Sequence, residues 1–111
     1  MARVLICEPV EETRILIECL VRREGHEIVS GDDSLRDLDV VFYEPASRAG
    51  LALARRAQRQ QPSVRLVACS ASPPRQAMTA PSPFASLLQP FSPGELRKVL
   101  EAALVGAPQP A

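Results

Sequence analysis

The sequence predicts an α/β domain in which a five-stranded parallel sheet carries helices on both faces. Short apolar runs without polar alternation recur along the chain, as expected of strands that are buried on both sides. Segments with apolar residues at helical spacing lie between most of these runs. Strand and helix alternate in this way along the chain, which favours a doubly wound sheet over separate layers of strands and helices. The length of 111 residues fits one such domain.

The first predicted strand is Val4–Cys7, and a helix is expected to begin after Pro9. Gly25 is well placed to end that helix in a left-handed conformation. We expect one face of the helix to pack on the sheet. The residues assigned to this face by their helical spacing are Ile15, Leu16, Cys19 and Leu20.

The second and third predicted strands, His26–Val29 and Val40–Tyr43, are unusually close in sequence. Parallel neighbours normally need a crossover of about a dozen residues or more. Between these two strands, Ser34–Asp37 offers room for at most one helical turn. The second helix is therefore predicted to be vestigial, or the crossover to be an extended loop.

The second half of the chain begins with a helix that Pro62 ends and that has basic side chains on its outer face. Val64–Cys69 and Phe84–Leu88 are the fourth and fifth predicted strands, and Ser72–Met78 offers a short helix between them. The residues that define the helix before Pro62 are Leu51, Leu53, Ala54 and Ala57 inside, with Arg55, Arg56 and Arg59 outside.

The last helix has the clearest start and end signals. Ser92–Glu95 forms a capping box with proline at the first helical position, apolar residues repeat at helical spacing through Leu104, and Gly106 ends the run. Residues 1–105 are thus predicted to form the domain, and residues 106–111 a linker-like tail.

Composition excludes several classes of function. Thirteen basic and thirteen acidic residues cancel, so no overall field favours nucleic acid or an anionic membrane. No apolar run is long enough to span a bilayer, and Met1 leads directly into a strand without a secretion signal, so the cytoplasm is the expected location. The three cysteines form no CxxC pair and His26 is the single histidine, so no metal site is predicted.

Functional groups of parallel sheets gather beyond the carboxyl ends of the strands. Four segments hold these positions. They are Cys7-Glu8-Pro9, Glu44-Pro45, Cys69-Ser70-Ala71 and Gln89-Pro90.

These four segments resemble the receiver domain of bacterial response regulators, and the resemblance covers Arg3 to Val105. Asp39–Glu44 is similar to the strand that ends in the phosphorylated aspartate, and Leu87–Phe91 to the strand that ends in Lys-Pro-Phe. The resemblance implies a flavodoxin-like sheet of order 2-1-3-4-5, here with shortened second and fourth helices. It also implies a cis peptide bond at Gln89-Pro90.

The same resemblance implies that the phosphorylation chemistry is lost. Active members hold magnesium with two acidic residues and the acceptor aspartate, and hold the phosphoryl oxygens with Lys and Ser/Thr. Here Glu8 stands without its acidic neighbour, Glu44 replaces the acceptor, Ser70 is retained and Gln89 replaces the lysine. We therefore expect a degenerate pocket of Glu8, Glu44, Ser70 and Gln89 without catalytic residues, metal or cofactor, in a protein that is not an enzyme.

Individual residues leave alternatives open. Glu44 either mimics the phosphorylated state by reaching Ser70 or is a solvated carboxylate, and Glu8 with Glu44 either holds a divalent ion or is a repelling pair. In the implied strand order Cys7 and Cys69 lie about 9–10 Å apart, beyond the ~7 Å limit of a disulfide. We expect both to be buried, inert thiols, Cys19 to be a packing residue and His26 to lie at the surface.

The predicted function is that of a pseudo-receiver, a phosphorylation-independent signalling module that binds a protein partner or associates with itself as a homodimer. The last helix, with Arg97, Lys98 and Glu101 outside, is the expected docking surface. Two alternatives are the sensory half of a longer response regulator and a phosphocysteine carrier similar to the sugar-transport IIB proteins, with Cys7 as its nucleophile. The second is disfavoured because the acidic loop after Cys7 lacks the glycines that cradle phosphate.

Overall fold

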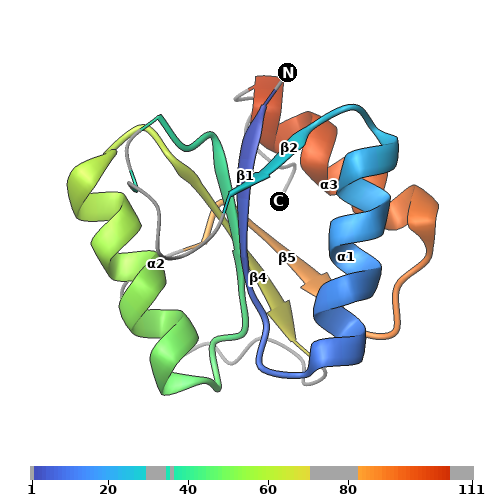
Figure 1. Cartoon of the computed structure of the whole chain (residues 1–111), viewed down its shortest axis with the longest axis horizontal. Helices are drawn as coiled ribbons and strands as arrows, with labels where there is room; N and C mark the ends of the chain where they lie inside the picture. The colour runs from blue at the N-terminus through green and yellow to red at the C-terminus, as the bar shows by residue number, and fades with distance from the viewer. Residues whose placement is uncertain (1, 30–34, 36, 71–82, 106–111) are drawn as a thin grey trace.

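The computed structural model of the chain describes residues 2–29, 35, 37–70 and 83–105. These residues form a parallel five-stranded sheet of order β2-β1-β3-β4-β5 with helices on both faces (Figure 1), which confirms the predicted fold class and strand order. The strands are β1 Arg3–Cys7, β2 Glu27–Val29, β3 Val40–Tyr43, β4 Arg65–Ser70 and β5 Ala85–Leu88, and the helices are α1 Glu11–Arg23, α2 Arg48–Gln60 and α3 Pro93–Val105.

The sheet separates two apolar cores, one under α1 and α3 and the other under α2 (Figure 1). Side chains of a strand alternate between the two faces. In β3, Val40 and Phe42 join the core under α1 and α3, whereas Val41 and Tyr43 join the core under α2. All four are buried, which explains why this strand is a continuous apolar run in the sequence.

Helix α1 buries a different face from the one predicted. Ile17, Leu20 and Val21 pack on the sheet, whereas Ile15 and Leu16 are 47% and 51% exposed. Two apolar stripes overlap on this helix, and the stripe that contains Ile17, Leu20 and Val21 is the buried one. The other stripe also contains Glu12, Arg22 and Arg23, which are exposed. Burying that stripe would bury these charges, which is costly.

Cys19 belongs to that outward stripe as well. The structure leaves its thiol exposed, so the prediction that it is a packing residue is wrong. His26, expected at the surface, is half-buried, and its Nδ1 accepts a hydrogen bond from the Ala2 backbone N–H at 3.1 Å. This contact holds the start of β1 beside the start of β2.

The helix ends follow the predicted signals. Gly25 has φ of +87°, the left-handed conformation expected after α1. At the start of α3, Ser92 Oγ accepts from the Glu95 N–H and Glu95 Oε1 accepts from the Ser92 N–H, both at 3.1 Å. These reciprocal bonds confirm the capping box.

The two helices that were predicted to be short lie partly or wholly outside the described residues. Between β2 and β3 the described residues contain no helix, and Leu35 is buried in the core under α2. Residues 30–34 and 36 lie outside the described residues. The same holds for the short helix predicted at 72–78 and for the tail at 106–111.

Helices α1, α2 and α3 have 13 residues each. None of these described helices combines the length and the apolar character that a membrane span requires.

Candidate functional site

The carboxyl ends of four strands meet at one edge of the sheet. Cys7 is in register with Tyr43, Tyr43 with Ala68, and Ser70 with Leu88. Because the strands are parallel, the residues that follow them emerge at the same edge. The structure therefore brings together the four segments that contain Glu8, Glu44, Ser70 and Gln89, the residues predicted from the sequence to form one pocket.

Glu8 has one carboxylate oxygen inside the protein. Oε1 accepts a hydrogen bond from the Val10 backbone N–H at 3.3 Å, whereas Oε2 is buried and has no hydrogen-bond partner. Burial raises the pKa of Glu8; the bond from Val10 lowers it, and the charge of Glu44 raises it. A nearby negative charge disfavours the ionised form of a carboxyl group, so the Glu44 charge acts in the same direction as burial.

Glu44 is tied to the loop that follows β3. Its Oε1 accepts from the Ala46 N–H at 2.9 Å, and its backbone N–H donates to the Cys7 carbonyl at 3.3 Å. Ser47 caps the start of helix α2, because its Oγ accepts a hydrogen bond from the Gly50 N–H at 3.1 Å. One oxygen of the Glu44 carboxylate is thus directed toward its own loop, and its proposed role as a mimic of a phosphorylated residue stays a hypothesis.

Gln89 contributes a neutral amide to this edge of the sheet. Its Nε2 donates a hydrogen bond to the Cys69 sulfur at 3.4 Å, and its backbone N–H donates to the Ser70 carbonyl at 2.8 Å. The Gln89-Pro90 peptide bond is cis, as the family resemblance implies. The side chain at the position of the family's lysine is therefore engaged with an uncharged thiol of the neighbouring strand.

Cys69 lies in one of the four strand-end segments found from the sequence, but it was predicted to be an inert thiol and was not included among the four residues of the site. Burial raises the pKa of its thiol to about 11; the bond from Gln89 lowers this pKa, and the charges of Glu8 and Glu44 raise it. The thiol thus lies within the electrostatic reach of both carboxylates. Its place one residue before the end of β4 brings it to the site, whereas its contact with Gln89 could not be read from the sequence.

Both strand-end cysteines are protonated under ordinary conditions. Burial raises the pKa of the Cys7 thiol to about 12, and β3 separates its strand from that of Cys69. Cys7 is half-buried, Cys69 is buried, and both are free thiols. A protonated thiol is a poor nucleophile, which supports the hypothesis of inert cysteines. The prediction that both are buried holds for Cys69 and is wrong for Cys7.

The donor set is a poor fit for magnesium. Mg²⁺ prefers oxygen ligands in near-octahedral geometry, and the described residues contain no group of three or more potential metal ligands. Within the described part of the chain, the Oε2 of Glu8 is a buried oxygen without a hydrogen-bond partner and could accept a cation. The Glu44 carboxylate is the second acidic group of the site, and the thiols of Cys7 and Cys69 are protonated.

We predict that Glu8→Gln stabilises the protein more at neutral pH than at acid pH. Because burial raises the pKa of Glu8, the folded state holds this proton more tightly than the unfolded state. The contribution of the protonated Glu8 carboxyl to the free energy of unfolding is present at low pH, and it is lost as pH rises through the pKa of Glu8 in the folded state. Replacing the carboxylate should increase the free energy of unfolding at about pH 7.5 by no more than about 1 kcal/mol, since solvent screens a partly exposed charge.

Urea unfolding of the wild type and Glu8→Gln at about pH 4 and about pH 7.5 measures this difference. Glu101→Gln, which removes an exposed carboxylate of α3, is the matched control. An equal effect of Glu8→Gln at both pH values would contradict the assigned electrostatics.

Known proteins resemble this chain in structure. TrrA, a response regulator from Thermotoga maritima solved with Mg²⁺-BeF, matches with TM-score 0.76 and 19% identity over 94% of this chain and 100% of its own. A second Thermotoga maritima response regulator matches with TM-score 0.75 and 15% identity over 95% and 98%. NtrX from Brucella abortus, solved with ATP, matches with TM-score 0.74 and 27% identity over 95% of this chain, which spans 27% of the NtrX chain.

No protein-family model and no curated protein matches the sequence. The structural similarity nevertheless extends over nearly the whole of the chain and of the two Thermotoga maritima response regulators. The strand order agrees with this similarity, and so does the emergence of Glu8, Glu44, Ser70 and Gln89 at one edge of the sheet. This chain therefore has the fold of a response-regulator receiver domain.

Proposed function

We propose that this protein is a pseudo-receiver, a signalling module that binds protein partners without being phosphorylated and that is not an enzyme. The observation that carries this proposal is the Gln89 amide bonded to the Cys69 sulfur beside two carboxylates. An active receiver needs an ammonium group and a metal at this place, because the transferred phosphoryl group is a dianion.

The charges around the pocket work against a phosphoryl group. No described arginine or lysine forms an ion pair with Glu8 or Glu44. The single lysine of the chain, Lys98, lies on the exposed side of α3. Glu44 also carries one methylene more than aspartate, which moves its carboxylate by more than about 1 Å and disturbs in-line attack.

A protein partner is the remaining means by which such a domain can act. The neighbour TrrA has also been solved in complex with the histidine kinase ThkA. On α3 of this chain, Arg97, Lys98 and Glu101 are exposed, and Arg97 forms an ion pair with Glu24 of α1 at 3.2 Å. Lys98 and Glu101 are exposed charged groups of α3 that form no ion pair with another described residue.

A receiver within a longer response regulator is a second candidate, supported by the match to part of the NtrX chain. A phosphocysteine carrier is a weaker one. The thiolate is the form that attacks phosphorus, and the pKa of Cys7 near 12 keeps the thiol protonated.

The test is an amide spectrum of the ¹⁵N-labelled protein before and after addition of magnesium with beryllofluoride, and separately with acetyl phosphate. We expect no saturable shift of the Glu44, Ser70 or Gln89 amides, because the pocket lacks the charges that hold a phosphoryl group. TrrA treated in the same way is the positive control for the reagents.

Magnesium-dependent, saturable shifts around Glu44 and Ser70 would refute the proposal. So would an added mass of one phosphoryl group that is lost on treatment with hydroxylamine, since hydroxylamine cleaves an acyl phosphate.

A further inference from the structure

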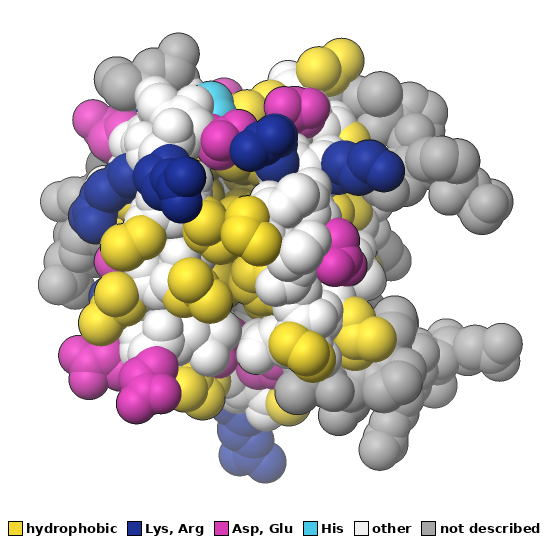
Figure 2. Space-filling model, turned by 90° about the vertical axis from the view of Figure 1, so that its right-hand side faces the viewer, with side chains coloured by type: hydrophobic (Ala, Val, Ile, Leu, Met, Phe, Trp, Pro, Cys, Tyr) yellow, Lys and Arg dark blue, Asp and Glu magenta, His cyan; other side chains and the backbone are white. Residues whose placement is uncertain are grey.

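The outward stripe of α1 is an exposed apolar surface. Ile15 and Leu16 are 47% and 51% exposed, and the Cys19 side chain beside them is exposed as well. Elsewhere α1 buries its apolar residues against the sheet. Figure 2 shows several groups of hydrophobic side chains on this side of the molecule, with polar and backbone atoms between some of them. Such a surface on a small domain indicates a binding site.

Oppositely charged residues lie at the two ends of this stripe. Glu12, Leu16, Cys19 and Arg23 are four, three and four residues apart, so they lie along one line of the helix. Their span is about 16 Å at the rise of an α-helix. In Figure 2, acidic side chains lie at the lower left, hydrophobic ones above them and basic ones at the upper left.

The charges at the two ends of this line have no ion-pair partner among the residues that the structure describes. Arg14 forms ion pairs with both Glu11, at 3.8 Å, and Glu18, at 3.0 Å. Glu12 and Arg23 form no ion pair with any residue that the structure describes. They remain available to another molecule.

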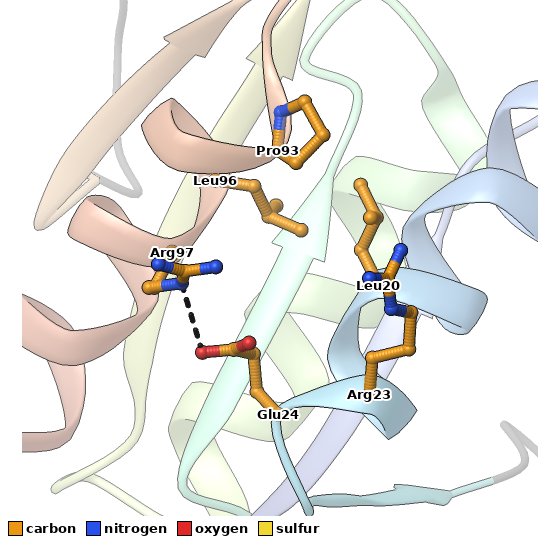
Figure 3. Close-up of a pocket in the computed structure, with 6 residues that line it drawn as sticks. All are labelled: Leu20, Arg23, Glu24, Pro93, Leu96 and Arg97. Atoms are coloured by element: carbon orange, nitrogen blue, oxygen red, sulfur yellow. Dashed lines mark ion pairs between the residues drawn. The ribbon is translucent and has the colours of Figure 1, made fainter.

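A shallow groove continues the apolar stripe toward α3. It has a volume of about 120 Å³, and Leu20 of α1 faces Leu96 and Pro93 of α3 across it (Figure 3). The ion pair between Glu24 and Arg97 closes one end. Arg23 borders the same groove, but no ion pair joins it to Glu24. The groove is too small to hold a helix. A helical partner would therefore lie on the outward stripe beside the groove.

The order of residue types along the stripe is acidic, apolar, apolar, basic. This order is complementary to itself when one copy is reversed. In an antiparallel pair of α1 helices, Glu12 meets the partner's Arg23 while Leu16 meets the partner's Cys19, and a twofold axis repeats both contacts. A parallel pair would place Glu12 against the partner's Glu12.

We infer that the chain forms a twofold dimer in which α1 packs antiparallel on α1 of a second copy, with Leu16 against the partner's Cys19 and Glu12 against the partner's Arg23. The inference deepens the proposed function by naming one partner of the module, a second copy, and its surface. It uses a different surface from the phosphorylation pocket. A single helix pair is a small interface, so the dimer is expected at protein concentrations of roughly 100 µM rather than at nanomolar ones.

Site-directed crosslinking tests the register. Leu16→Cys should give a covalent dimer under mild oxidation, because facing residues of two packed helices come within the ~7 Å between Cα atoms that a disulfide allows. The crosslink should disappear when Cys19→Ser is added to Leu16→Cys. Ala52→Cys, at an exposed position of α2, is the control for random collisions and should stay monomeric on a non-reducing gel.

Charge exchange tests the orientation. Glu12→Arg and Arg23→Glu should each raise the dimer Kd by about tenfold, because each replaces two attractions by two repulsions. The double variant Glu12→Arg/Arg23→Glu should restore the dimer, since the exchanged charges again oppose each other. Sedimentation equilibrium measures all three.

A wild type that stays monomeric at roughly 100 µM, or single and double variants with equal Kd values, would overturn the inferred dimer. These experiments use no phosphodonor. Failure of the dimer is therefore distinguishable from failure of the pseudo-receiver proposal, which rests on the response to magnesium and beryllofluoride.

Discussion

Ile17→Ala is expected to lower the free energy of unfolding by about 2–5 kcal/mol, the cost of removing a fully buried Ile side chain from a packed core. Ile17 is 0% exposed and belongs to the core under α1 and α3. Single domains of this size are stable by about 5–15 kcal/mol in total. Urea unfolding followed by circular dichroism at low protein concentration measures the loss.

Leu16→Ala is the matched control, because it truncates an aliphatic side chain in the same helix, one residue away. Leu16 is 51% exposed, so the expected change is within about 0.5 kcal/mol. A larger loss from Leu16→Ala than from Ile17→Ala would mean that α1 buries the face first predicted from the sequence. The pair therefore decides which side of α1 is free for a second copy.

Gly50→Ala is expected to destabilise the protein by about 1–3 kcal/mol through overpacking. A Cβ on Gly50 would lie 3.2 Å from the Cys7 carbonyl oxygen and 3.4 Å from that of Glu44. Both neighbours are backbone atoms at the ends of β1 and β3, so they cannot rotate away. The first turn of α2 would have to move, and the Glu44 loop with it.

Gly94→Ala is the control for this substitution, since Gly94 lies in the first turn of α3. A Cβ there would meet only the Ser92 hydroxyl, at 3.8 Å. Alanine favours a helix over glycine by up to about 1 kcal/mol, so Gly94→Ala should be neutral or stabilising. Thermal unfolding of both variants provides the measurement, and equal effects would contradict the close packing at Gly50.

The fold was predictable because its signals are local and agree with one another. Buried parallel strands need apolar residues on both faces, and β3 has them at each of its four positions. The Ser92 capping box marks a helix start through local side-chain hydrogen bonds, and Gly25 marks a helix end through its left-handed backbone conformation. The orientation of α1 was not predictable in the same way, because Leu20 belongs to both apolar stripes and only tertiary packing selects one.

The site was predictable in part for a similar reason. Position at a strand end follows from strand assignment, so Glu8, Glu44, Ser70 and Gln89 could be grouped from the sequence. Side-chain direction could not. That Gln89 donates to Cys69, and that one oxygen of Glu8 has no partner, depends on rotamers that only the packed structure defines.

The contact between the Gln89 amide and the Cys69 thiol joins two uncharged groups across the β4–β5 edge. Ionic strength and divalent ions act mainly on charged groups, so neither should alter this contact. The contact should therefore persist at salt concentrations that screen the surface ion pairs of the domain, such as the one between Arg97 and Glu24.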